Sequence, residues 1–552
     1  MDRKRWLAHY PQETPATLSY PRMALTQFLQ KAAEEFPNSI AIRFMGKSIC
    51  YSELWKHIRC FAGALRELGI RKGDRIAIML PNCPQAVISY YGILYIGGIV
   101  VQTNPLYMER ELVYQLRDSG AKVVICLDMV YTRVVNAKKE TEINHIIVTR
   151  IQDYFPWAKK LIYPFAVKQK NQPKLEGEFH NWEDFIRSTQ ACAEQEEINP
   201  DKDLALLQYT GGTTGTAKGV MLTHANLVAN VCQCHAWFYK TKVGSERFLA
   251  VIPFFHVYGM TVAMNLSIHL AGTLIILPKF DVNQLFETIQ KEKPTIFPGA
   301  PTMYIGIVNH TSLKKYDLSS IEACISGSAP LPVEIQEKFE LFTGGKLVEG
   351  YGLTECSPVT HANPIWGRRK NGSIGLPWPD TDAKIVHPES GMELAPHQIG
   401  ELMIKGPQVM KGYWNRPSDT DEVLQDGWLR TGDLAYMDEE GFFYIVDRKK
   451  DVIIAGGYNI YPREIEEVLY EHDAVAEAAV VGVPDPYRGE TVKAFIVVKE
   501  GMQVTQEELN QFCRERLASY KVPRLYEYRK EFPKTFVGKV LKRILIEGEM
   551  NE

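Results

Sequence analysis

The sequence predicts an α/β protein: a large N-terminal part of doubly wound sheets, a small β-barrel-like subdomain within it, and a small α+β part at the C-terminus. Three observations predict this fold. Helical and strand patterns alternate from about residue 23 to residue 200, and short strands with glycine and asparagine turns follow at about 372–446. A charged run at 447–451 then precedes a compact unit. We therefore expect an N-terminal domain at 1–446, a hinge at 447–451 and a C-terminal domain at 452–552.

The individual elements follow from periodicity and turn residues. Apolar residues at helical spacing predict helices at 25–32, 54–68 and 227–237, and short apolar runs predict strands at 40–44, 122–127 and 248–253. The run 86–101 predicts a buried helix that leads into a strand, because it is too short to cross a membrane comfortably. Beyond the hinge, a helix opening near Pro462 and strands at 478–483 and 492–498 predict a βαβ-like unit, and Thr505 with Glu508 predicts a capped helix.

The composition is that of an ordinary globular protein. Of 552 residues, 45% are hydrophobic and 23% are charged, and the net charge of −3 gives no sign of a nucleic-acid partner. Ten cysteines form no paired framework, which indicates a reducing compartment. Cys232, Cys234 and His235 lie in a helical pattern, which favours a structural role over a metal site. The N-terminus lacks the apolar segment of a signal peptide, so we expect a cytoplasmic protein.

Residues 209–220, Y-T-G-G-T-T-G-T-A-K-G-V, carry the strongest functional signal. Three glycines and four threonines followed by Lys218 lie between two apolar runs, so backbone N–H groups, hydroxyls and one positive charge can surround an anion. The alternatives are a flexible surface turn and a P-loop. The P-loop pattern requires Gly-Lys-Ser/Thr, whereas Ala217 precedes Lys218 and Gly219 follows it. The stretch predicts a nucleotide-phosphate site of another kind.

Three further motifs carry functional signals, and the first two lie at predicted strand ends. His256 follows a strand amid aromatic residues, where α/β folds place ligands, although a core histidine is the alternative. Small residues at 327–329 let a flat ring approach the backbone. In E-G-Y-G-L-T-E, 349–355, an aromatic between glycines can stack on a base, a threonine can reach a phosphate, and a carboxylate can hold Mg²⁺.

Three more segments complete the series: Asp433 in Thr-Gly-Asp, the charged run at 447–451, and Lys539 near the end of the chain. Read alone, these would be a turn residue, a solvated linker and a surface lysine. In their order and spacing, however, six of these motifs (the loop at 209–220, His256, 349–355, Asp433, 447–451 and Lys539) resemble those of the adenylate-forming superfamily of acyl-CoA synthetases, luciferases and peptide synthetase adenylation domains. The nearest form resembles the bacterial long-chain fatty acid CoA ligases, and the likeness covers almost the whole chain.

The resemblance implies a ligase that uses ATP, Mg²⁺ and coenzyme A. A fatty acid carboxylate attacks the α-phosphate of ATP, pyrophosphate leaves, and the CoA thiol displaces AMP from the acyl adenylate. The implied catalytic residues are Lys539, His256 and Thr354, and the implied Mg²⁺ ligands are Thr213 and Glu355. The implied phosphate-binding residues are Thr210, Gly211, Gly212, Thr213, Thr214, Gly215, Thr216 and Lys218.

The resemblance also assigns the rest of the nucleotide and CoA sites. The adenine-binding residues would be Gly327, Ser328, Ala329, Glu349, Gly350, Tyr351 and Gly352, with Thr354 reaching the α-phosphate. The ribose would bind Asp433 and Arg448, the C-terminal domain would be mobile about Lys450, and the CoA tunnel would meet Gly456, Gly457 and Tyr458. Some long-chain members carry Trp at Met260 and Lys at Ile454, so acyl gating and pyrophosphate contact differ here.

Several alternatives stay open on the sequence alone. The acid could be shorter or aromatic, the acceptor could be a carrier protein, or the chain could be a non-catalytic nucleotide-binding or membrane-docking protein. Residues 153–174 combine aromatic residues with five lysines, which could graze a membrane, although we favour a loop or helix packed on its own domain. A homodimer and a peripheral contact with the inner face of the membrane complete the expected partners.

Overall fold

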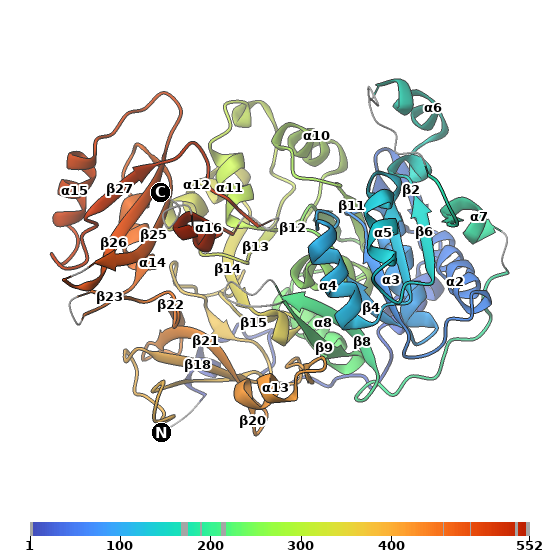
Figure 1. Cartoon of the computed structure of the whole chain (residues 1–552), viewed down its shortest axis with the longest axis horizontal. Helices are drawn as coiled ribbons and strands as arrows, with labels where there is room; N and C mark the ends of the chain where they lie inside the picture. The colour runs from blue at the N-terminus through green and yellow to red at the C-terminus, as the bar shows by residue number, and fades with distance from the viewer. Residues whose placement is uncertain are drawn as a thin grey trace.

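The computed structural model describes residues 4–166, 175–187, 190–210, 217–455, 458–485, 487–535 and 539–547. It is a mixed α/β structure with two large sheets, a small antiparallel sheet and a separate C-terminal sheet (Figure 1). The predicted fold class is confirmed. In the described residues, no helix is both long and apolar enough to pass through a lipid bilayer.

The first large sheet has eight strands in the order β19-β9-β8-β4-β3-β5-β6-β7. The strands from β8 to β7 are parallel, and β9 runs antiparallel to β8. Their bounds are β3 (Arg75–Met79), β4 (Ile99–Gln102), β5 (Val123–Leu127), β6 (His145–Thr149), β7 (His180–Asn181), β8 (Leu204–Thr210), β9 (Lys218–Thr223) and β19 (Gly412–Tyr413).

The second large sheet has nine strands in the order β16-β15-β14-β13-β12-β10-β11-β1-β2, and its middle strands from β14 to β1 are parallel. Their bounds are β1 (Ile40–Phe44), β2 (Lys47–Cys50), β10 (Arg247–Ala250), β11 (Thr273–Ile276), β12 (Ile296–Gly299), β13 (Ala323–Ser326), β14 (Lys346–Gly352), β15 (Val359–Ala362) and β16 (Leu376–Pro377). Parallel strands need crossover connections, which the helices provide.

The helices of this part connect the strands of its sheets. They are α1 (Thr26–Glu35), α2 (Tyr51–Glu67), α3 (Pro84–Tyr95), α4 (Glu109–Ser119), α5 (Tyr131–Lys138), α6 (Trp157–Ala166), α7 (Trp182–Arg187), α8 (His224–Trp237), α9 (Leu266–His269), α10 (Val282–Glu292), α11 (Pro301–Val308), α12 (Val333–Thr343) and α13 (Pro417–Val423). Every residue of α3 is buried, and the chain then enters β4, which confirms the expected buried helix leading into a strand.

The short strands after residue 372 build a five-stranded antiparallel sheet. It contains β17 (Asp382–Val386), β18 (Gly400–Lys405), β20 (Leu424–Gln425), β21 (Trp428–Met437) and β22 (Phe443–Arg448). The strand β22 runs through Asp447 and Arg448, so regular structure continues into the first two residues of the expected hinge, and a turn follows at 449–451.

The C-terminal part, coloured red in Figure 1, contains β23 (Ile453–Ala455), β24 (Tyr458–Ile460), α14 (Pro462–Tyr470), β25 (Val475–Asp485), β26 (Gly489–Val498), α15 (Gln506–Arg514), β27 (Leu525–Tyr528) and α16 (Lys542–Glu547). The expected βαβ-like unit is present in a split form, because β23 and β25 flank α14 and both run antiparallel to β26, which lies between them. The strands β25 and β26 form an antiparallel hairpin. Only three residues connect these strands, and a parallel pair needs a crossover of about a dozen or more. The predicted cap is confirmed: Thr505 Oγ1 accepts from the backbone N–H of Glu508 at 3.2 Å.

The hydrophobic core is divided along the chain. One continuous cluster extends from Trp6 to Phe443 and fills both large sheets. Two further clusters, 453–522 and 479–545, pack the C-terminal elements. The C-terminal part therefore has apolar cores of its own.

Candidate active site

Several predicted site residues meet at one edge of the nine-stranded sheet. His256 follows β10, residues 327–329 follow β13, and Glu349 to Gly352 form the end of β14. These strands are parallel neighbours through β12, so their carboxyl ends lie at the same edge. The turn after β13 lies against an aromatic ring, since a Cβ on Gly327 would be 3.3 Å from the ring of Tyr258.

Asp433 is fixed by the small antiparallel sheet. The register of β21 and β22 places Asp433 opposite Arg448, and the Arg448 Nε lies 3.6 Å from Asp433 Oδ1. The hydroxyl of Tyr351 donates to Asp433 Oδ2 at 2.5 Å. Burial raises the pKa of Asp433 above its ordinary value, and the charge of Arg448 opposes that rise. The structure thus joins Tyr351, Asp433 and Arg448, three of the predicted nucleotide contacts, in one cluster.

Lys539, in the C-terminal part, adds its charge to this cluster. Its charge acts on Asp433 and His256, and Arg448 is the largest charged influence on it. Burial and the neighbouring Arg448 charge lower the pKa of Lys539 to about 8. The loop is held at Thr535, whose Oγ1 accepts from the backbone N–H of Lys539 at 3.1 Å and whose N–H donates to the Lys539 carbonyl at 2.7 Å.

His256 is neutral at physiological pH. Burial, with a smaller effect of the Lys539 charge, lowers the pKa of His256 to about 4. The backbone N–H of Tyr258 donates to His256 Nδ1 at 3.3 Å, which assigns the ring proton to Nε2. A neutral imidazole can donate one hydrogen bond to a carboxylate or phosphate oxygen without adding charge.

The phosphate-binding stretch lies between β8 and β9, which pair Thr210 with Lys218. Residues 211–216, which include five predicted phosphate-binding glycines and threonines and the predicted metal ligand Thr213, lie outside the described residues. Lys218 Nζ forms an ion pair with Asp419 at 3.0 Å and lies 5.0 Å from the centre of the Tyr413 ring.

Glu355 has the properties of a cation ligand. Burial raises the pKa of its carboxyl group above the ordinary value, while the phenol of Tyr413 donates to Glu355 Oε1 at 2.8 Å and partly offsets this. The phenol of Tyr413 and the backbone N–H of Glu355 are both neutral donors and leave acceptor capacity on the carboxylate, which fits a hard cation such as Mg²⁺. The neighbouring Thr354 begins a short 3₁₀ turn (Thr354–Cys356).

Comparison with known proteins identifies the family to which this chain belongs. Residues 29–414 match the AMP-binding enzyme family, and residues 464–539 match the AMP-binding enzyme C-terminal domain. The chain belongs to the AMP-binding enzyme family. Among curated relatives, the long-chain-fatty-acid–CoA ligase of Bacillus subtilis strain 168 is 55% identical over 99% of this chain and 98% of its own length. The protein of that name from Salmonella typhimurium strain LT2 is 41% identical over 98% of each chain.

Solved structures of similar proteins share the architecture of this AMP-binding enzyme. ATP-bound MatB from Rhodopseudomonas palustris has a TM-score of 0.84 and 28% identity, over 95% of this chain and 99% of that one. The anthranilate CoA ligase AuaEII, in complex with anthranoyl-AMP, has a TM-score of 0.86 and 25% identity, over 96% of this chain and 98% of that one.

Two site residues of this AMP-binding enzyme were missed from the sequence. Tyr413 contacts both Glu355 and Lys218, so one phenol lies between the predicted metal ligand and the predicted phosphate-binding lysine. Gln208 donates from Nε2 to the Phe255 carbonyl at 2.9 Å and ties β8 to the His256 loop. The sequence offered two signals for these residues. Tyr413 is an aromatic residue in a Gly-Tyr-Trp-Asn turn, and Gln208 is a glutamine in a largely apolar strand.

Of the predicted CoA-contacting residues, the structure describes only Tyr458, which lies away from the cluster. Gly456 and Gly457 lie outside the described residues, and Tyr458 is exposed on the C-terminal part, where it stacks on Tyr520 with ring centres 4.5 Å apart. Lys450 lies in the turn after β22, where burial and the Arg448 charge lower its pKa.

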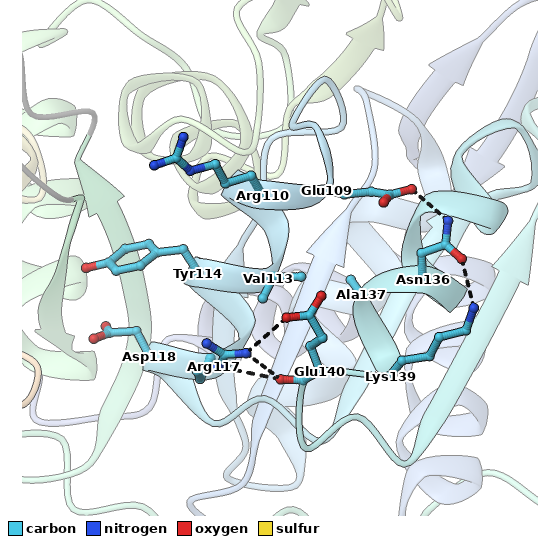
Figure 2. Close-up of a pocket in the computed structure, with 10 residues that line it drawn as sticks. All are labelled: Glu109, Arg110, Val113, Tyr114, Arg117, Asp118, Asn136, Ala137, Lys139 and Glu140. Carbon is cyan, nitrogen blue, oxygen red and sulfur yellow. Dashed lines mark hydrogen bonds and ion pairs between the residues drawn. The ribbon is translucent and has the colours of Figure 1, made fainter.

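A cavity of about 820 Å³ lies beside the active site rather than in it, between α4 and α5 (Figure 2). Some of the polar and charged residues on its walls contact one another. Arg117 pairs with Glu140 at 3.3 Å, and Asn136 bonds to Glu109. A smaller cavity of about 470 Å³ contacts the active site directly, because Glu355 and Tyr413 line it.

Proposed function

We propose that this enzyme is a long-chain fatty acid CoA ligase that forms an acyl adenylate and then an acyl-CoA. The observation that carries the proposal is the cluster in which Asp433 contacts Tyr351 and Arg448 and is affected by the charge of Lys539, within an AMP-binding fold. The curated relatives named as long-chain ligases support the substrate, because they match over nearly the full length of the chain.

The described side chains have distinct tasks in the first half reaction. Attack of one anion on another builds negative charge at the α-phosphate, and the Lys539 ammonium would stabilise that charge. Asp433 would accept hydrogen bonds from the ribose hydroxyls, and neutral His256 would orient the acyl carboxylate. Glu355 and Thr213 would hold Mg²⁺, which when bound neutralises phosphate charge.

The decisive experiment for the function is an acid series. Pyrophosphate release from ATP and thioester formation with CoA are measured for saturated acids from acetate to palmitate. We expect both activities to rise with chain length. Preference for a short or aromatic acid would contradict the substrate, and pyrophosphate release with transfer only to a carrier phosphopantetheine would contradict the acceptor.

We also propose that residues 447–451 are the hinge between the domains at 1–446 and 452–552. The separate apolar cores on either side of this segment support that division. Rotation about Lys450 would withdraw Lys539 and bring the loop of Tyr458 to the site. Lys450→Pro should therefore slow thioester formation more than adenylate formation. Equal loss in the two half reactions would contradict the hinge.

We propose a peripheral membrane contact at α6, which projects from the upper right of the molecule in Figure 1. Tyr163 packs its ring against Phe155, whereas Trp157, Leu161 and Ile162 are 79%, 65% and 62% exposed. The expected packed helix is therefore present, but one face of it is apolar and uncovered. Trp on a short basic segment fits an anionic lipid surface, which is also where a long-chain acid partitions.

Vesicle sedimentation tests this contact. The variant Trp157→Glu with Leu161→Glu should lose binding to vesicles that contain phosphatidylglycerol. Leu341→Glu, at an exposed apolar residue of α12, is the matched control and should bind like the parent protein. Equal binding by both variants would place the contact elsewhere. The expected homodimer stays a prediction, which sedimentation equilibrium would check.

A further inference from the structure

Arg463 is a buried arginine in the first turn of α14. Its backbone N–H donates to Asp447 Oδ2 at 3.0 Å, and its Nε donates to Glu467 Oε1 at 2.9 Å. The side chain is only 10% exposed. A fully ionised guanidinium is rarely buried without a structural or functional reason.

The Arg463 guanidinium, in the C-terminal part, also contacts a residue of the proposed nucleotide site in the N-terminal part. Arg463 Nη2 lies 3.7 Å from Glu349 Oε1, and Glu349 is itself 6% exposed at the end of β14. The other oxygen, Glu349 Oε2, accepts from the backbone N–H of Leu331 at 3.3 Å. Because Leu331 closely follows the Gly327–Ala329 turn, these contacts connect α14 to the proposed adenine site.

The free energy of this buried ion pair depends on the orientation of the C-terminal part. Burial raises the pKa of Glu349 to about 7, and the Arg463 charge is the largest influence that lowers it again. If Arg463 moved away, the Glu349 carboxyl group would either stay charged in an apolar environment with one weak hydrogen bond and no counter-charge or take up a proton. Leaving one member of a buried ion pair alone is strongly unfavourable. The pair therefore favours the orientation in which it is intact.

In that same orientation the Lys539 charge acts on Asp433 and His256. Lys539 and Arg463 both belong to the segment after the proposed hinge, whereas Glu349, Asp433 and His256 precede it. A rotation that withdraws Lys539 must also separate Arg463 from Glu349.

We propose that Arg463 is a positioning residue whose ion pair with Glu349 latches the C-terminal domain in the adenylate-forming orientation. This inference rests on the proposed function. It adds a specific interdomain contact that couples the position of the Lys539 loop to the adenine side of the nucleotide site. The latch must open before the thioester step.

The test separates the half reactions. Adenylation is measured as fatty-acid-dependent ATP–pyrophosphate exchange, and thioester formation is measured from chemically prepared palmitoyl-AMP and CoA. Arg463→Met, which keeps side-chain length but not charge, should lower the exchange rate on the order of tenfold and leave thioester formation unchanged or faster. Arg463→Lys should restore about half of the lost exchange, since a charge remains near Glu349.

Two controls make the result specific. Arg369→Met removes a half-buried arginine that pairs with Glu340 entirely within the N-terminal part, and it should leave the ratio of the two half reactions at the parent value. In a Glu349→Gln background at saturating ATP, Arg463→Met should have little further effect, because its partner is already neutral.

The outcomes are distinguishable. A parent enzyme that shows neither half reaction would contradict the proposed function. A parent enzyme that shows both, with an Arg463→Met variant that loses both equally or neither, would contradict the latch alone.

Discussion

The two sides of the active site are held in very different ways. On the N-terminal side, Asp433 lies within a strand pair and contacts both Tyr351 and Arg448. On the C-terminal side, Lys539 lies on a short loop that Thr535 closes through two hydrogen bonds. Tyr351, Asp433 and Arg448 are thus joined within a strand-paired scaffold, whereas Lys539 belongs to a unit with its own apolar cores. In the proposed two-step reaction, this division would let the charge that serves the first half reaction leave before the second.

The largest expected effect comes from removing the movable cation. Lys539→Ala should lower adenylation by about 10²–10³, since a preorganised charge at a developing anion is lost. Thioester formation from prepared palmitoyl-AMP should change little. The two half-reaction assays check this, and equal loss in both would mean that the two sides of the site are not functionally separate.

A change on the rigid side should affect both half reactions. Asp433→Asn keeps a hydrogen-bonding group for Tyr351 but removes the charge opposite Arg448, so ribose binding should weaken. We expect the KM for ATP to rise by about tenfold, with weaker binding of the adenylate as well. Steady-state kinetics and adenylate competition measure this. An effect confined to kcat would contradict a binding role.

The pH dependence should also distinguish the two sides. With a pKa of about 8, Lys539 loses its proton as pH rises through 8, and adenylation should fall with it. Lys539→Arg should remove this alkaline limb, because arginine stays charged. Thioester formation should lack the limb in both proteins. An unchanged limb in the arginine variant would assign it to another group.

The lowered pKa of Lys539 also determines how this group changes the free energy of unfolding with pH. Below pH 8 the lysine is charged in both the folded and the unfolded chain, and its burial lowers the free energy of unfolding. Between pH 8 and its ordinary pKa of 10.5, the unfolded chain binds more protons. This group alone therefore makes the folded state more stable as pH rises through that window.

The smallest effect is expected at Tyr413. Tyr413→Phe removes the hydroxyl that donates to Glu355 but keeps the ring beneath Lys218. Loss of one hydrogen bond of about 1 kcal/mol should raise the Mg²⁺ concentration for half-maximal adenylation several-fold. Titration of Mg²⁺ at fixed ATP provides the measurement, with Tyr444→Phe as a control away from Glu355. Equal requirements would show that Glu355 is positioned without this phenol.

Local patterns in the sequence were sufficient for much of this structure. The capped helix at Thr505, the buried helix before β4 and the positions of His256 and residues 327–329 after strands all follow from short-range signals. Each of these features depends on residues that are neighbours in the chain, so its physical cause is visible in the sequence alone.

Features that depend on distant pairing could not be read in that way. The alignment of Asp433 with Arg448 comes from a strand register, and the contact of Tyr413 with Glu355 joins residues 58 positions apart. The antiparallel pairing of β25 with β26 could not be predicted, because apolar runs do not specify pairing direction. The roles of residues 211–216, Gly456 and Gly457 stay predictions, since they lie outside the described part of the chain.

The measurement that most directly tests the central claim is a single-turnover reaction with palmitate, ATP and Mg²⁺, first without CoA and then after its addition. We predict one equivalent of pyrophosphate and of palmitoyl-AMP per enzyme before CoA is added. Palmitoyl-CoA and AMP should appear only afterwards. Pyrophosphate release that requires CoA from the start, or formation of ADP instead of AMP, would contradict the two-step account.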